Sequence, residues 1–261
     1  MKRSSGVRLC ATAAVSALSL ALVTGCSDEG SKGSGDGKGP DGKPAAKALS
    51  AAELRDLIVA KGEVPGYDVG AVPAGRAKPI TTDGATCGSL ARVLSGLPPT
   101  EAAAQTDRLA TETRKKDPTD NATSLDDLAD GKFEDALNKS MDRDVTTVSL
   151  SSYEGDGATQ ALKAVSDAVK ACSGGFSGEQ AGTEVKFTKV AEEKPSGSGD
   201  ASVAFSATSE SDGETAPLHA EVVRHGNTVA SYFTMNIGAM MTKKAYVVSP
   251  EVVKAQSAKL K

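Results

Sequence analysis

The dipeptide Gly226-Asn227 constrains the fold of this chain more than any other feature, because it joins two runs of β-forming residues. A two-residue hairpin turn fixes which residues of the two strands lie opposite each other. Strands over 216–225 and 228–235 therefore pair in a single register. An antiparallel hairpin is predicted at this point of the chain.

The register of this hairpin separates two faces. One face is mostly apolar and pairs Leu218 with Met235, Ala220 with Phe233, and Val222 with Ser231. The opposite face is mixed and pairs His219 with Thr234, Glu221 with Tyr232, and Val223 with Ala230. Because side chains alternate along a strand, the apolar face is expected to lie on the core.

The remaining elements complete an α+β domain. A helix is expected to begin at Ser50, since Ser50 and Glu53 have the spacing of a capping box. Further helices are predicted near 87–95, 158–172 and 250–259, and strands near 67–72, 145–150, 184–190 and 201–208. Residues 100–142 are charged and are expected to be mainly helix and loop. The predicted architecture is one domain, residues 48–261, with an antiparallel sheet (a C-terminal meander) packed by helices.

The N-terminal 25 residues have the features of a secretory signal peptide. Three basic residues (Lys2, Arg3 and Arg8) precede an apolar run over 9–23, and Leu22-Val23-Thr24-Gly25-Cys26 resembles the lipobox of bacterial lipoproteins. The resemblance implies diacylglycerol on the Cys26 thiol and cleavage before it. An ordinary signal peptide or a short membrane anchor are the alternatives, although the run is shorter than the ~20 residues that span a bilayer. Residues 26–47, rich in Gly and Ser, are predicted to form a flexible tether.

Charge and location follow from this cleavage. Removing three basic residues from the 30 of the chain leaves 27 against 34 acidic residues, a net charge near −7. Nucleic-acid binding needs a basic face, so it is disfavoured. The expected location is the extracytoplasmic face of the cell membrane, with the lipid as the membrane partner.

Two cysteines remain after Cys10 in the signal peptide and Cys26 at the lipid are set aside. Cys87 and Cys172 each lie on the apolar stripe of a predicted helix. In an oxidising compartment such a pair favours a disulfide, with two buried free thiols as the alternative. A redox-active pair is less favoured, since the chain has no Cys-x-x-Cys spacing.

No catalytic, metal-binding or cofactor-binding motif is present in the sequence. His219 and Glu221 share one face of a strand with the opposing Tyr232, which makes them a candidate polar ligand site. The alternative is that they belong to an amphipathic outer face of the sheet. No catalytic residues, metal ligands or cofactors are assigned.

Several short segments follow one another along the chain: Val64-Pro65-Gly66-Tyr67, Cys87-Gly88-Ser89-Leu90, Val169-Lys170-Ala171-Cys172, 199–205 and 222–229. Their order resembles a known family, the actinobacterial lipoproteins related to the extracellular sensor domain of PknH-type mycobacterial kinases. The resemblance would cover residues 48–261. It implies an antiparallel sheet with flanking helices, a ligand cleft and no enzymatic activity. It transfers no site residues, and the sensor domain of the kinases carries two disulfides where only one pair is available here.

Two functions are therefore weighed. The first is a membrane-anchored, non-enzymatic sensing or binding module for an unidentified small molecule, cell-wall component or envelope protein. The second is an envelope hydrolase with dispersed carboxylates, since paired acids can act without a local motif. A pocket in which carboxylates converge would distinguish them.

Overall fold

The computed structural model describes residues 47–74, 78–113 and 140–260. The predicted signal peptide, Cys26 and most of the tether lie outside the described residues. In the described part of the chain, no helix is long and apolar enough to cross a membrane.

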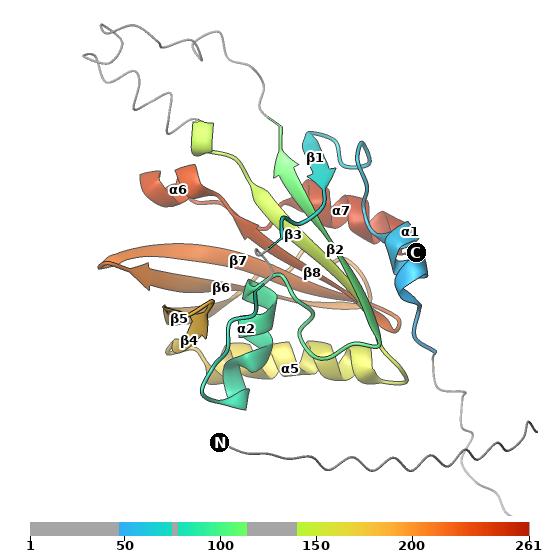
Figure 1. The fold of residues 1–261 in the computed structure, drawn as a ribbon, viewed down its shortest axis with the longest axis horizontal. Coiled ribbons are helices and arrows are strands. Elements are labelled where there is room, and N and C mark those ends of the chain that lie inside the picture. Colours follow the sequence, from blue (N-terminus) through green and yellow to red (C-terminus); the bar gives the residue numbers. More distant parts are fainter. Residues whose placement is uncertain (1–46, 75–77, 114–139, 261) are drawn as a thin grey trace, which may run out of the picture. The chain divides into compact units, whose positions relative to one another are not determined.

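In these residues eight strands form one antiparallel sheet, and the predicted α+β fold class is confirmed (Figure 1). The two halves of the chain meet at the β3–β8 pair. The order across the sheet is β1 (Tyr67–Gly70), β2 (Ala104–Glu112), β3 (Val145–Ser152), β8 (Thr228–Met235), β7 (Glu214–His225), β6 (Ala201–Ser211), β5 (Thr183–Glu193) and β4 (Phe176–Gln180).

The predicted hairpin is confirmed residue by residue. Ala220 lies opposite Phe233, and Glu221 lies opposite Tyr232. The expectation of helix and loop for 100–142 is wrong at 104–112, which form β2. This strand pairs with β3 over residues 104–111, so a contact distant in sequence decides its conformation.

Helices cover both faces of the sheet. One apolar cluster packs α2 (Gly88–Leu94) and α5 (Gly157–Ala171) on the face that carries Ala220 and Val222. A second cluster packs α1 (Ala51–Leu57) and α7 (Pro250–Lys259) on the face that carries Val223 and Tyr232. We call these the α2–α5 face and the α1–α7 face. A short helix, α6 (Ile237–Thr242), follows β8.

The helices expected to start at Ser50 and at Ser249-Pro250 are both present, but only the first has the expected side-chain cap. Ser50 and Glu53 make the complete capping box of α1. Ser249 precedes Pro250 as predicted, but its hydroxyl does not cap α7. It lies 2.8 Å from Thr146 Oγ1, which is buried in the sheet. Ser249 therefore ties the start of α7 to β3.

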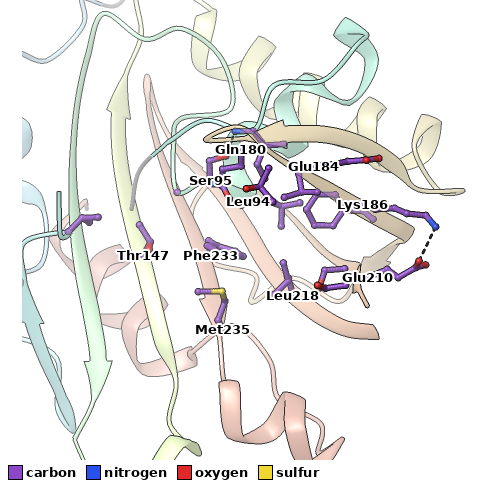
Figure 2. Close-up of a pocket in the computed structure, with 18 of the residues that line it drawn as sticks. Leu94, Ser95, Thr147, Gln180, Glu184, Lys186, Glu210, Leu218, Phe233 and Met235 are labelled. Carbon is purple, nitrogen blue, oxygen red and sulfur yellow. Dashed lines mark hydrogen bonds and ion pairs between the residues drawn. The ribbon is translucent and has the colours of Figure 1, made fainter. Parts of the chain in front are cut away.

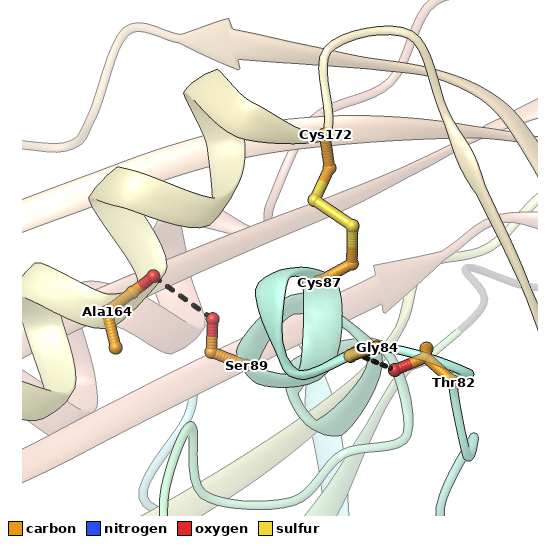
Figure 3. The surroundings of a disulfide bond; sticks show 6 residues. All are labelled: Thr82, Gly84, Cys87, Ser89, Ala164 and Cys172. Carbon is orange, nitrogen blue, oxygen red and sulfur yellow. Dashed lines mark hydrogen bonds between the residues drawn. A yellow bond between two sulfur atoms is a disulfide. The ribbon is translucent and has the colours of Figure 1, made fainter.

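The predicted disulfide joins Cys87 and Cys172, with 6.1 Å between their Cα atoms (Figure 3). It connects the start of α2, at the 3₁₀ turn Ala85–Cys87, to the end of α5. Ser89 Oγ adds a hydrogen bond of 3.1 Å to the carbonyl of Ala164. The alternative of two free thiols is not what the structure contains.

Candidate functional site

A pocket of about 410 Å³ opens on the α2–α5 face, beyond the end of α2 (Figure 2). Its floor is the sheet, where Leu218 of β7 and Phe233 and Met235 of β8 present apolar side chains. The facing wall comes from the end of α2 and from the β4–β5 hairpin, including Leu94 and Phe187. The interior is thus mainly apolar.

The α2 side of the pocket is held in place by Ser95. This residue is 7% exposed, and its hydroxyl accepts a hydrogen bond of 2.8 Å from the Ile80 amide. The same hydroxyl donates to the carbonyl of Ala91 at 2.7 Å. Gly96 follows at φ 74°, where a Cβ would lie 2.7 Å from Thr147 Cγ2. The end of α2 therefore sits directly against β3, and only glycine permits that approach.

The opposite side of the pocket is joined to the same loop. Thr81 and Glu179 exchange backbone hydrogen bonds of 2.9 and 2.8 Å, which makes a β-bridge between the loop before α2 and the edge strand β4. Gln180 Nε2 also donates to the carbonyl of Lys78 at 2.8 Å. Segments about one hundred residues apart thereby form one continuous wall.

Charged side chains surround the mouth of the pocket. Lys186 Nζ and Glu210 Oε1 form an ion pair of 3.0 Å, with 52% and 32% of their side chains exposed (Figure 2). Asp107 and Glu184 also line the pocket. The lining thus carries three carboxylates and one ammonium group, and the arrangement suits an apolar group inside and a polar or cationic group at the mouth.

The predicted ligand residues lie elsewhere, on the α1–α7 face. His219 and Glu221 are adjacent on that face of β7, and Glu221 lies opposite Tyr232. They are only 7%, 3% and 0% exposed, so the alternative of an amphipathic outer face is wrong. The α1–α7 layer covers this side of the sheet. Their predicted role as ligand residues remains a prediction.

Each of these three side chains has a different environment. His219 Nδ1 lies 3.0 Å from both carboxylate oxygens of Glu193, and its ring meets the ring of Tyr246 edge-on at 4.5 Å. Glu221 accepts two hydrogen bonds from Ser196. The Tyr232 hydroxyl is buried with no hydrogen-bond partner among the described residues. Burial raises the pKa of Tyr232, the nearby Ser257 hydroxyl opposes this, and the charge of Glu221 raises the pKa further.

Metal binding has no support in the described residues, where no group of three or more His, Cys, Asp or Glu side chains is placed to hold an ion.

The sequence predicts no ligand site at the pocket residues, although it places Leu218, Phe233 and Met235 on one apolar face. The alternation predicts that this face belongs to the core. The pocket exists because the β4–β5 hairpin and the loop at 78–82 enclose this end of the sheet, and the sequence contains no local signal for their contact.

Comparisons with known proteins give likeness in structure but none in sequence. No family model matches the chain. No curated protein matches it. Among solved structures, the extracellular domain of PknH from Mycobacterium tuberculosis is similar, with a TM-score of 0.48 and 12% identity over 82% of this chain and 95% of that chain. The expected resemblance to that domain is thus confirmed. A likeness of this size says nothing about ligand or activity, and the fold class rests on this chain's own sheet and helices.

Proposed function

We propose that this protein is a lipid-anchored, extracytoplasmic binding module, without enzymatic activity, whose pocket on the α2–α5 face takes a small, mainly apolar ligand. The pocket is the observation that carries the proposal. The lipobox-like segment ending at Cys26 supports anchoring outside the cell. The Cys87–Cys172 disulfide supports an oxidising compartment.

The apolar character of the ligand follows from the floor of the pocket. Leu218, Phe233 and Met235 offer carbon atoms, and a ligand that covers them removes apolar surface from water at about 25 cal/mol per Å². The pocket volume lies in the range of roughly 300–1,000 Å³ that is usual for small-molecule sites. Its two walls are fixed by Ser95 and by the Thr81–Glu179 bridge, so little ordering cost is expected on binding.

Binding is tested with the exported chain, residues 26–261, carrying Cys26→Ser so that no acyl chain competes for the pocket. The probe is N-phenyl-1-naphthylamine, a neutral dye that fluoresces in apolar surroundings. Met235→Trp fills the floor of the pocket and is expected to weaken binding by at least about tenfold. Met241→Trp is the matched control, because Met241 is 58% exposed on α6 and lies outside the pocket.

Two results would count against this function. One is the absence of saturable dye binding to the unsubstituted pocket. The other is equal dye affinity of the Met235→Trp and Met241→Trp chains, which would place the dye elsewhere.

Anchoring is tested separately in cells. The unmodified chain is expected in the membrane fraction with a diacylglycerol-modified Cys26, and the Cys26→Ser chain is expected to lose that modification. Mass spectrometry of the processed N-terminal peptide measures it. An unmodified N-terminal peptide on the unsubstituted chain would contradict anchoring and leave the pocket proposal intact.

A further inference from the structure

A second pocket, of about 560 Å³, lies on the α1–α7 face, where the start of α7 meets β6 and β7. It is separate from the first pocket, since the two share no lining residue and lie on opposite faces of the sheet. Its polar lining is Glu193, Lys194, Ser196 and Glu221. Its other lining residues are apolar.

Glu221 is the unusual member of this lining. It is 3% exposed, and its Oε1 accepts hydrogen bonds of 2.9 Å from the Ser196 amide and 2.6 Å from the Ser196 hydroxyl. In the part of the chain that the structure describes, no Lys, Arg or His side chain forms an ion pair with it. A buried carboxylate is costly unless a cation compensates its charge.

The other charged groups of this pocket do not supply that cation. Glu193 adds a second carboxylate, and the nearby His219 ring is turned to Glu193 through Nδ1 at 3.0 Å. Lys194 is exposed at the edge and forms no ion pair within the described residues. The Glu221 carboxylate is therefore largely covered by protein but lines the pocket. A cation that enters the pocket from solvent can reach it.

The walls restrict which cation fits. Val247, Val248, Pro250 and Val253 form an apolar side next to Glu221, with Ala204 of β6 opposite Glu221 in the sheet. These groups favour a ligand with an aliphatic body. Ser196 and Glu221 favour a group that donates hydrogen bonds and carries positive charge.

We propose that this pocket binds a primary ammonium group on an aliphatic arm, with the ammonium at Glu221 and the arm along Val247, Val248 and Val253. A free aliphatic amine and the side chain of a lysine in a peptide share this chemistry. The site does not depend on the function proposed for the first pocket, because it uses other residues on the other face.

Calorimetric titration of the Cys26→Ser chain with n-pentylammonium tests the site, and n-pentanol serves as the neutral analogue of similar shape. Binding of the amine, and at least about tenfold weaker binding of the alcohol, is expected. Glu221→Gln is expected to lose at least about tenfold in amine affinity, because it keeps the shape and removes the charge. Glu192→Gln, an exposed neighbour outside the lining, is expected to change affinity by less than about twofold.

A second variant leaves the buried carboxylate untouched. Val247 is 57% exposed at the pocket, so Val247→Lys brings a tethered ammonium to the site and is expected to weaken n-pentylammonium binding by about tenfold. Met241→Lys adds the same charge at an exposed position outside the lining and is expected to bind like the parent chain.

A third titration distinguishes the two possible sources of the ammonium group, a free amine and a lysine in a peptide. A capped Gly-Lys-Gly peptide that binds more tightly than n-pentylammonium indicates a peptide ligand, and the reverse order indicates a free amine. The proposal is overturned if neither binds, if n-pentanol binds as well as the amine, or if both Glu221→Gln and Val247→Lys leave amine affinity unchanged.

Discussion

The two faces of the sheet come from the same strands, yet different interactions hold their helices. On the α2–α5 face, α2 and α5 pack through apolar side chains and are joined by the Cys87–Cys172 disulfide. On the α1–α7 face, buried polar groups join the layer to the sheet and α1 to α7. Among the described residues, the buried histidine and carboxylate side chains, His219 and Glu221, both lie on this second face. The pockets on the two faces differ in the same way. The pocket on the α2–α5 face is mainly apolar, and the pocket on the α1–α7 face contains the buried carboxylate of Glu221.

The disulfide accounts for the largest expected effect. Replacing Cys87 and Cys172 by Ser opens a loop of 85 residues and is expected to lower the free energy of unfolding by about 2–5 kcal/mol. Urea denaturation of the parent and double variant measures the difference. A loss below about 1 kcal/mol would mean that apolar packing alone holds the α2–α5 layer.

The polar counterpart on the other face is Gln256. Its side chain is fully buried, accepts a hydrogen bond from the Val59 amide at 2.9 Å, and donates to the Leu57 carbonyl at 2.9 Å. Gln256→Met preserves length and leaves both backbone groups unpaired. Because each unpaired buried group costs about 1–3 kcal/mol, a loss of about 2–4 kcal/mol in unfolding free energy is expected.

Gln160→Met on α5 is the control for this change. Gln160 is exposed, and among the described residues its side chain bonds only to Asp156 four residues earlier, so an effect within about 0.5 kcal/mol is expected. Similar losses in the two variants would show that the Gln256 contacts do not hold α1 to α7.

The contrast between the faces also separates what the sequence could predict from what it could not. Ser50, Glu53 and the Gly226-Asn227 turn act on neighbours a few residues away, and the helix start and hairpin register they predict are both present. The alternation around the turn correctly placed Glu221 and Tyr232 on one face. These features follow from local geometry.

Contacts distant in sequence decide the rest. β2 has no strong strand pattern and depends on pairing with β3. From sequence, the polar face of β7 and β8 resembles the exposed face of a sheet. It is in fact covered, because α7, which is distant from β7 in sequence, packs on it. Gln256 gives no sign in the sequence that it bonds a loop almost two hundred residues away. Both candidate pockets are formed by such distant contacts.

Tyr232 and Tyr246, on or beside the α1–α7 face, differ in whether the hydroxyl group has a hydrogen-bond partner. The Tyr246 hydroxyl donates to the carbonyl of Pro217, whereas the buried Tyr232 hydroxyl has no partner among the described residues. Tyr246→Phe is therefore expected to lower the free energy of unfolding by about 1 kcal/mol. Tyr232→Phe removes a buried, unpaired polar group and is expected to be neutral or stabilising by up to about 1 kcal/mol. A clear loss in Tyr232→Phe, measured by urea denaturation, would reveal a hydrogen bond at that hydroxyl.

The smallest expected effect is a pH dependence at His225, at the end of β7. Burial lowers the pKa of His225 below its ordinary value of 6.5, the charge of Arg224 lowers it further, and Asp200 opposes both. The unfolded chain therefore takes up a proton before the folded one. The contribution of His225 to stability is complete above pH 6.5 and decreases as the pH falls from there through the lowered pKa of the folded state.

His225→Gln removes this titration and leaves His219, which is present in both chains. Unfolding free energies measured at about pH 7.5 and about pH 5 are expected to fall less in His225→Gln than in the parent. The buried Nε2 atom of His225 has no partner in the described residues, so no hydrogen bond there offsets the cost of its desolvation. An equal fall in both chains would assign the pH dependence to other groups, and a steeper fall in the variant would mean that the protonated ring stabilises the end of β7.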